Sequence, residues 1–161
     1  MEKLIFQYAP KTWDHIDTSN PVRRVLLRPD SAEYLLIQRE VQMATTPPGY
    51  SILQIQRFQS SFDYGQLLIR EQLIINLFNY RPLYRVRRFV CIESRFLQVA
   101  LEYNLDYRRC GLGRLCLRKH LQDFHGGDKV ILVVQVLTPT PNSEEIIPEN
   151  SSDYYIEYIV V

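Results

Sequence analysis

The stretch SAEYLLIQREVQMATTPPGYSILQIQRFQSSFDY, from Ser31 to Tyr64, decides the fold of this chain. Asp30 or Ser31 caps a helix whose apolar side chains recur at a spacing of three and four residues. The run TPPG at residues 46–49 ends that helix in a turn, because proline and glycine do not continue it. Residues 50–58 then carry apolar groups on both faces, which predicts an inner strand, and the serine pair that follows caps a second helix.

Outside this stretch the sequence predicts further strands and helices joined by irregular segments. Residues 1–21 are expected to be irregular, because Pro10, Trp13 and Asn20-Pro21 break any regular pattern. Strands early and late with helices between them predict a single α+β domain over residues 1–161, with a mostly antiparallel sheet system. The expected elements are strands at 25–27 and 74–78, a basic connector at 82–88, a helix at 92–103, a loop at 104–113, and strands at 130–137 and 154–161.

Composition is that of an ordinary globular chain, with 46% hydrophobic and 23% charged residues among 161. The net charge of +1 hides an uneven distribution. Residues 81–120 carry ten basic and three acidic side chains, whereas residues 121–161 carry one basic and seven acidic side chains. Such blocks pair with each other inside a fold, bind a protein partner, or bind nucleic acid. We expect internal pairing to account for most of these charges.

The cysteines Cys91, Cys110 and Cys116 form no metal-type pair, and His120 and His125 lack a matching pair of thiols, so we expect no metal site. Reduced thiols of this kind are typical of an intracellular protein. The longest apolar run, residues 130–134, is far shorter than the ~18 residues of a membrane helix, so no membrane partner is expected. The N-terminus carries early charges and too short an apolar stretch for a signal peptide.

One set of residues has the order and spacing of a known family: Val25, Leu26, Ser31, Glu33, Tyr34, Ile52, Ile55, Arg57, Gln59, Phe62 and Tyr64. Through them the chain resembles the opening of the poly(ADP-ribose) polymerase catalytic domain. The R-I-Q-N of that family is Arg57-Phe58-Gln59-Ser60 here. Weaker matches are the run 104–108 (NLDYR) with Gly111 and Gly113, the core strand at 128–137, and the closing strand at 155–161. The resemblance implies an ADP-ribosyltransferase-like fold, with mostly antiparallel split β-sheets flanked by helices.

The resemblance also implies a chemistry, which is cleavage of the nicotinamide–ribose bond of NAD through a cationic ribose. The family grips NAD with a His-Gly pair and a tyrosine, and a glutamate stabilises the cation. The His-Gly pair falls on Asn79-Tyr80, where the Tyr80 side chain would block the space that glycine leaves for nicotinamide. The tyrosine falls on Leu115, and the glutamate falls on Glu144, with Glu145 as the alternative. We therefore expect no catalytic residue, no NAD binding and no other cofactor.

A fold that has lost its catalytic groups is useful through its surface, so we expect a pseudoenzyme that acts as a protein-interaction scaffold in a regulatory or silencing assembly. Degenerate members of the family imply a nuclear rather than cytoplasmic location, and homodimerisation stays open. Two alternatives also stay open: an active mono-ADP-ribosyltransferase with a non-standard triad, and a nucleic-acid-binding module that uses arginine and tyrosine side chains. The expected interaction surface is Arg81, Tyr84, Arg85, Arg87 and Arg88.

Overall fold

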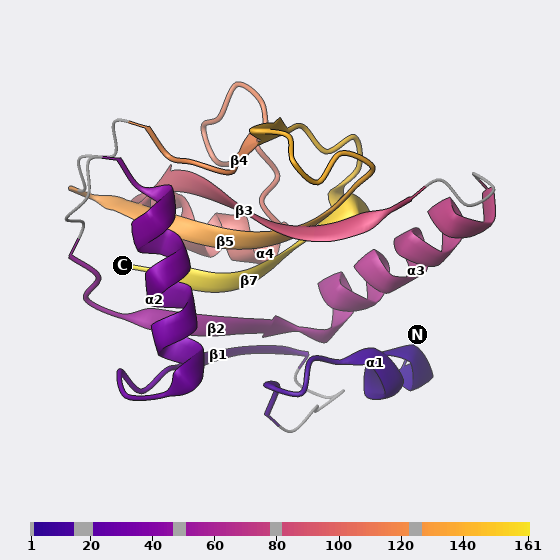
Figure 1. Ribbon diagram of the computed structural model, residues 1–161, viewed down its shortest axis with the longest axis horizontal. Coiled ribbons are helices and arrows are strands. Elements are labelled where there is room, and N and C mark those ends of the chain that lie inside the picture. Colours follow the sequence, from indigo (N-terminus) through magenta and orange to yellow (C-terminus); the bar gives the residue numbers. More distant parts are fainter. Residues whose placement is uncertain (1, 15–20, 47–50, 78–81, 123–126) are drawn as a thin grey trace.

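The computed structural model of the chain describes residues 2–14, 21–46, 51–77, 82–122 and 127–161 (Figure 1). Within these residues, seven strands form one sheet in the order β1-β2-β7-β5-β3-β4-β6, and every pairing between the strands is antiparallel. The strands are β1 (Val22–Leu26), β2 (Ile55–Ser60), β3 (Tyr84–Glu93), β4 (Leu117–Arg118), β5 (Lys129–Thr138), β6 (Glu145–Ile146) and β7 (Tyr154–Val160). The α-helices are α1 (Glu2–Tyr8), α2 (Ala32–Ala44), α3 (Ser61–Leu77) and α4 (Leu97–Glu102), and short 3-10 helices cover Ser94–Phe96 and Ser151–Asp153.

Both helices expected within Ser31–Tyr64 are present, whereas residues 47–50 of the expected turn lie outside the described residues. The Ser31 side chain caps α2 by accepting a hydrogen bond from the Tyr34 backbone N–H at 3.2 Å. Tyr34, Ile37 and Val41 are buried, so the helix turns its apolar stripe to the sheet. Strand β2 is an inner strand between β1 and β7, although it begins only at Ile55. The mixed α and β architecture with an antiparallel sheet is therefore confirmed.

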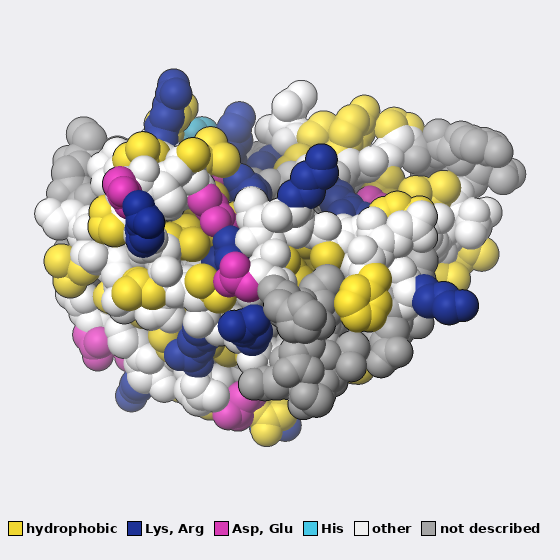
Figure 2. Space-filling model, turned by 90° about the horizontal axis from the view of Figure 1, so that it is seen from below, with side chains coloured by type: hydrophobic (Ala, Val, Ile, Leu, Met, Phe, Trp, Pro, Cys, Tyr) yellow, Lys and Arg dark blue, Asp and Glu magenta, His cyan; other side chains and the backbone are white. Residues whose placement is uncertain are grey.

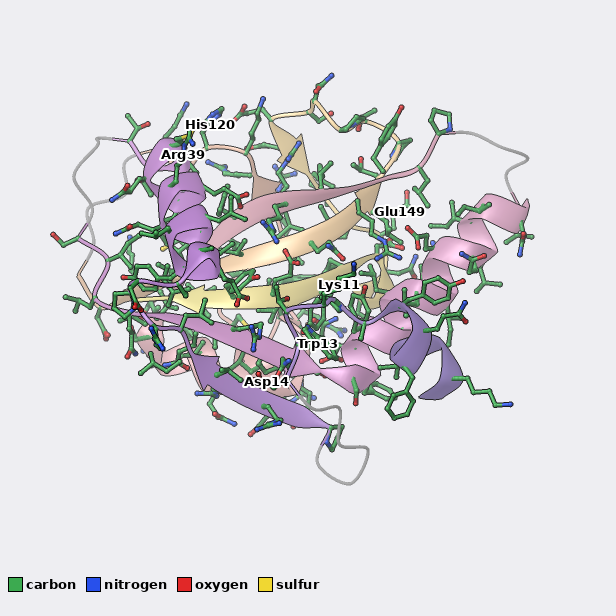
Figure 3. The ribbon with its side chains drawn as sticks, turned by 60° about the horizontal axis from the view of Figure 1, so that its bottom comes forward. Lys11, Trp13, Asp14, Arg39, His120 and Glu149 are labelled. Carbon is green, nitrogen blue, oxygen red and sulfur yellow. The ribbon has the colours of Figure 1, made fainter. Side chains whose placement is uncertain are left out.

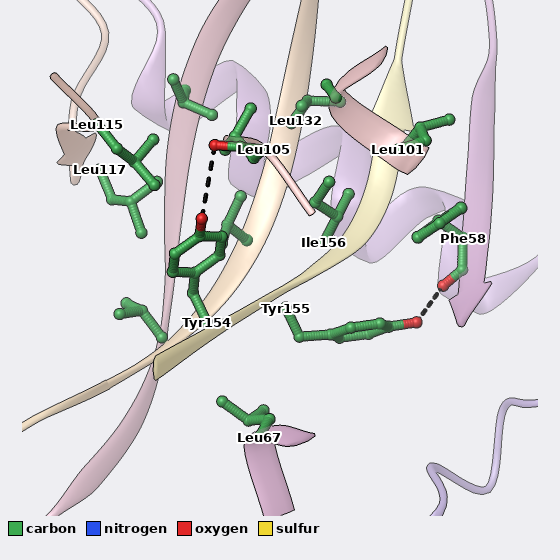
Figure 4. Packing of buried hydrophobic residues seen from close by; sticks show 14 of the residues in the cluster. Phe58, Leu67, Leu101, Leu105, Leu115, Leu117, Leu132, Tyr154, Tyr155 and Ile156 are labelled. Atoms are coloured by element: carbon green, nitrogen blue, oxygen red, sulfur yellow. Dashed lines mark hydrogen bonds between the residues drawn. The ribbon is translucent and has the colours of Figure 1, made fainter. Parts of the chain in front are cut away.

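The two faces of the sheet carry separate cores. Helix α2 covers one face, where Ile131 and Val133 of β5 are buried together with Tyr158 of β7. Helix α4 and the loop after it cover the other face, where Leu132 and Ile156 are buried (Figure 4). Because β5 is buried on both faces at the centre of the sheet, its continuous β-branched sequence is what a doubly covered strand requires.

Five expectations about the fold were wrong. Residues 74–77 are not a strand but the last turn of α3, and Tyr84–Arg88 are not a connector but the first half of β3. The helix expected at 92–103 begins only at Leu97, because β3 continues to Glu93. The segment 1–21 is not irregular throughout, since Glu2–Tyr8 forms α1. The strands expected to form split sheets make one sheet.

The errors in β3 have a common physical cause. Its side chains alternate, so that Val86 and Val90 pack into the core beneath α4 while Phe89 packs beneath α2. Arg87 and Arg88 interrupt both apolar faces, and charged side chains suggest exposure when only the sequence is known. The sequence pattern therefore does not reveal that β3 is an inner strand of ten residues.

Candidate functional site

The structure describes only some of the positions that the resemblance assigns to NAD binding. Asn79, Tyr80 and Arg81 lie outside the described residues. Residues 74–77 of the strand expected before this pair belong instead to α3, which continues to Leu77. The strand that follows α3 in the chain is β3.

Leu115 and Glu144 lie at opposite ends of the small β4–β6 pair. Leu115 is 5% exposed and belongs to the core cluster beneath α4. Glu144 is exposed, and its carboxylate lies 2.8 Å from Nδ1 of His120 and accepts a hydrogen bond from the His120 backbone N–H. Burial acts to raise the pKa of Glu144, but the hydrogen bond and the charge of His120 outweigh it and lower that pKa. The backbone C=O of Glu144 accepts from Lys119, beyond β4, whereas Leu115 precedes β4.

The arginines of the expected interaction surface are engaged within the chain. Arg85 donates from Nε to Glu71 at 2.7 Å, and Arg87 donates from Nε to Glu157 at 2.6 Å. Arg88 is 5% exposed and donates to the backbone oxygens of two residues after β5, Pro141 and Ser143. Tyr84, at 43% exposed, is the most accessible of the described members. Arg85 and Arg87 therefore pair with acidic side chains of the same fold, whereas Arg88 binds backbone oxygens.

The glycine-containing loop that resembles the family has a structural role in capping α4. Asn104 and Leu105 adopt positive φ of 41° and 58°, and the Asn104 side chain donates to the backbone C=O of Tyr154 at 3.3 Å. The Tyr154 hydroxyl donates in return to the Asn104 C=O at 2.8 Å. Gly111 has a φ of 67°, and a Cβ there would lie 3.1 Å from the Phe96 ring, so a side chain at this position would be strained.

A cleft on the α2 face of the sheet brings charged and aromatic side chains from several elements together. We call it the sheet-face cleft; its volume is about 540 Å³, within the range of small-molecule and side-chain pockets. It lies between α2 and the segment that connects α1 to β1, with Lys11, Trp13 and Asp14 in front of the middle of the sheet (Figure 3). The residues that line it are Pro10, Lys11, Thr12, Trp13, Ala32, Glu33, Leu36, Arg57, Phe58, Tyr64, Arg87, Gln135, Tyr155, Glu157 and Tyr158.

Arg57 forms the first charged group of the cleft. Its guanidinium donates to Glu33 of α2 at 2.6 Å and to Asp14 at 2.9 Å, and its side chain is only 7% exposed. Glu33 accepts a second hydrogen bond, at 2.9 Å, from the hydroxyl of Tyr158. The sequence analysis singled out Arg57 and Gln59 as matches to the family, and both side chains are buried. Among the described residues the Gln59 amide has no hydrogen-bond partner, whereas Arg57 links α2 and the connecting segment to β2.

Arg87 forms the second charged group. It lies beside Gln135 and Tyr155 in one row across β3, β5 and β7, and it binds Glu157 and Glu40. A β-bulge at Val133/Val134 leaves Glu157 without a partner on β5, so that Glu157 and its neighbour both line the cleft. Burial raises the pKa of Glu157 although the charge of Arg87 acts to lower it.

Aromatic rings form one wall of the cleft. The Trp13 ring centroid lies 5.2 Å from that of Tyr64 and 6.1 Å from that of Tyr155, and the two tyrosine rings meet edge to face. The Tyr64 hydroxyl donates to the backbone C=O of Tyr8, which ties the end of α1 to α3. No sequence pattern marks Trp13 or Glu157 as a site residue, apart from Trp13 being the single tryptophan of the chain.

The surface around these groups carries both signs of charge. Figure 2 shows basic and acidic side chains interspersed on one face, with no extended area of a single sign. Within the described residues no group of His, Cys, Asp and Glu side chains could hold a metal ion, and no helix is long and apolar enough to cross a bilayer. The cleft therefore offers aromatic surface, carboxylates and paired guanidinium groups for non-covalent binding.

A scan against models of protein families and a search of curated proteins found no match to this chain, so its function is argued from the geometry and the sequence.

Proposed function

We propose that this chain is an ADP-ribosyltransferase-like domain that does not cleave NAD and that acts as a protein-interaction scaffold in a regulatory or silencing assembly. The order of elements along the chain supports this proposal. After α2 come β2 with Arg57 and Gln59, α3, β3, the short helix α4, the NLDYR run at 104–108, the core strand β5 and the closing strand β7. The ADP-ribosyltransferase family has its matching motifs in the same order, which is the basis of the resemblance.

One observation carries the non-catalytic part of the proposal. The strand that follows α3 is β3, and its sequence YRVRRFVCIE contains neither histidine nor glycine. A His-Gly pair on this strand is what the family uses to hold the ribose and to let the carboxamide reach the backbone. In its place β3 carries arginines that bind Glu71 and Glu157 and apolar side chains that fill the core.

The remaining triad positions support the same conclusion. Stabilising a cationic ribose requires a preorganised carboxylate next to a ring that stacks on nicotinamide. Leu115 is packed in the core, and Glu144 binds His120 on the surface at the other end of the β4–β6 pair. A carboxylate placed in this way cannot act on a sugar held beside Leu115.

The catalytic part of the proposal is tested by calorimetry with millimolar NAD, together with an assay for released nicotinamide. We expect no binding heat and no nicotinamide. Binding or hydrolysis that Glu144→Gln abolishes and that Glu93→Gln leaves intact would establish the active mono-ADP-ribosyltransferase instead. Glu93 is a suitable control because it is an exposed carboxylate at the end of β3 and lines no cleft with Leu115.

The scaffold part is tested by affinity purification from the native tissue with cross-linking. We expect a defined set of proteins that wild type and Glu93→Gln retain and that Asp14→Asn loses. Asp14 is 49% exposed and binds Arg57 in the wall of the cleft, and Arg57 keeps its ion pair with Glu33 when Asp14 is changed. An identical set of proteins with all three chains would refute a role of the cleft in this interaction.

A further inference from the structure

Strand β1 forms one edge of the sheet, because among the described residues it pairs only with β2 (Figure 1). The antiparallel pairing runs without a bulge from one end of β1 to the other. A hydrogen bond from the Ser61 N–H to the Pro21 C=O, at 2.9 Å, precedes the ladder, and one from the Leu27 N–H to the Ile55 C=O, at 3.0 Å, follows it. Since bonded positions recur every two residues, the odd-numbered residues of this segment bond to β2.

The even-numbered residues of β1, which are Val22, Arg24 and Leu26, therefore direct their backbone N–H and C=O groups away from β2. The residues of β2 opposite Val22 and Arg24 show the same alternation, because their backbone groups point the other way and bind the Tyr155 hydroxyl of β7. No described strand pairs with the outer side of β1. An edge of this kind is a template for a further strand.

The side chains of the same three residues lie in one row on the α4 side of the sheet. Val22 is 46% exposed and Leu26 is 63% exposed. Arg24 between them donates to Oε1 of Gln98 in α4 at 2.6 Å, and it forms no ion pair with any described residue. Gln98 is neutral and itself donates to Glu102 at 2.8 Å. The open edge thus presents a cation between two uncovered apolar side chains.

We propose that the outer edge of β1 binds an extended segment of a protein partner, antiparallel to β1, in which a carboxylate lies between two apolar side chains at alternate positions. The segment adds a strand to the sheet through backbone hydrogen bonds. Directly opposed residues share a face, so the carboxylate lies opposite Arg24 and the apolar side chains lie opposite Val22 and Leu26. This pairing stands whether or not the domain cleaves NAD, and whether or not the sheet-face cleft binds a partner.

A second copy of the chain fits this edge less well than an acidic segment does. An antiparallel pair of β1 strands centred on Arg24 puts the two Arg24 side chains directly opposite each other, and like charges in such positions are destabilising. A shift of one strand by two residues relieves the repulsion but leaves only three of the five residues of each β1 paired. Charge therefore favours a carboxylate-bearing partner over self-association.

Amide hydrogen exchange, measured by NMR on the full chain, tests whether the edge is open. The N–H groups of Val22, Arg24 and Leu26 should exchange at least about tenfold faster than those of Arg23 and Val25, which bond to β2. Equal protection of all five in the free chain would mean that the edge is already covered, and the proposal would be wrong. Protection of the even-numbered residues that rises with chain concentration would make a second copy the occupant and would also overturn it.

The same chain is then titrated with a blocked peptide, Thr-Val-Thr-Glu-Thr-Val-Thr, up to about 5 mM, because a single short strand binds weakly. At saturation the N–H groups of Val22, Arg24 and Leu26 should become at least about tenfold better protected. A peptide with lysine in place of glutamate should bind at least about threefold more weakly. N-methylation of the glutamate, whose N–H faces β1, should abolish binding, whereas N-methylation of the next threonine, whose N–H faces away, should not.

Variants assign the binding to β1. Leu26→Pro removes an outward N–H and no bond to β2, which an edge strand tolerates, and it should weaken binding at least about tenfold relative to Leu26→Ala. Arg24→Glu should reverse the preference, so that the lysine peptide binds better than the glutamate peptide, and this result keeps the test decisive if Leu26→Pro does not fold. Asp14→Asn, which tests the cleft, should leave peptide binding unchanged.

Three outcomes would refute the pairing. One is a titration without any change in shifts or protection. The second is an equal effect of the two N-methyl groups, because only one of them faces β1 in an antiparallel pair. The third is an Arg24→Glu chain that still prefers the glutamate peptide, because the carboxylate then does not lie opposite Arg24.

Discussion

Replacing Tyr155 by phenylalanine removes one hydroxyl that joins two strands where they separate. Tyr155 of β7 is 1% exposed, and its hydroxyl donates to the backbone C=O of Phe58 and accepts from the backbone N–H of Ser60 (Figure 4). Strands β7 and β2 pair directly only from Ile55 to Arg57, so the hydroxyl extends their connection by side chain. Phenylalanine keeps the ring contacts with Trp13 and leaves both backbone groups without this partner.

The cost follows from these contacts. Each neutral hydrogen bond contributes about 1 kcal/mol net, and a buried group left unpaired costs about 1–3 kcal/mol. We therefore expect Tyr155→Phe to lower the free energy of unfolding by about 2 kcal/mol. For a chain of this size that corresponds to a fall in Tm of about 4–8 °C.

The assay is thermal and urea denaturation followed by circular dichroism, with Tyr84→Phe as the matched control. Tyr84 is 43% exposed, so its variant should change the free energy of unfolding by less than about 0.5 kcal/mol. The urea m-value should stay constant, which shows that the same surface unfolds in both chains. A loss below about 0.5 kcal/mol for Tyr155→Phe, or an equal loss in both variants, would refute the bridging role.

Arg57→Met should lower the free energy of unfolding by about 3 kcal/mol, because it leaves the Glu33 carboxylate without its charged partner. Adding Glu33→Leu should restore most of that loss. If calorimetry finds that the losses of the two substitutions add, this reasoning is wrong. Burial raises the pKa of Glu157, so its contribution to stability is complete below the unfolded value of about 4.3 and is lost as the pH rises through the folded value. The free energy of unfolding of Glu157→Gln, measured in urea, should therefore rise relative to that of wild type as the pH increases above the unfolded pKa of about 4.3, and a decline would mean that the attraction of Arg87 outweighs burial. A gel shift over a salt series should show no nucleic-acid complex at physiological salt, because β3 arginines bind carboxylates; a complex that Arg109→Ala weakens would restore that alternative.

The sequence was sufficient to predict those helices and strands whose structure is determined by their own residues. The cap at Ser31 and the apolar spacing after it fix α2, and the β-branched run of β5 identifies the central strand. The strand expected at 74–78 was wrong over residues 74–77, because leucine and isoleucine at a strand-like density also suit the last turn of a long helix. Arg87 was predicted to lie on an interaction surface because its carboxylate partners, Glu40 and Glu157, come from elements distant in the sequence, α2 and β7.

The cleft was beyond prediction for a similar reason. Trp13 and Glu157 are far apart in the sequence, and they face one cavity only because the connecting segment crosses the sheet in front of a β-bulge. Arg57 was singled out as part of a family motif, and the structure places it in the wall of the cavity. A bulge moves a side chain by one position and leaves no reliable mark on the sequence pattern, so the orientation of Glu157 required the structure.

The buried ion pairs of the cleft raise the question of what the fold gains from them. A partly buried ion pair such as Arg87–Glu157 rarely stabilises a protein more than well-packed apolar side chains would, because desolvation offsets most of the attraction. Stability alone therefore gives no reason to place two guanidinium groups and their carboxylate partners on the α2 face of the sheet, beside the aromatic rings of the cleft. Recognition of a polar ligand gives such a reason, because the paired charges hold one another in fixed positions before a ligand arrives. The ion pair with Glu157 that removes Arg87 from the expected interaction surface thus also fixes Arg87 in the wall of the cleft, whereas Arg85 binds Glu71 outside that lining.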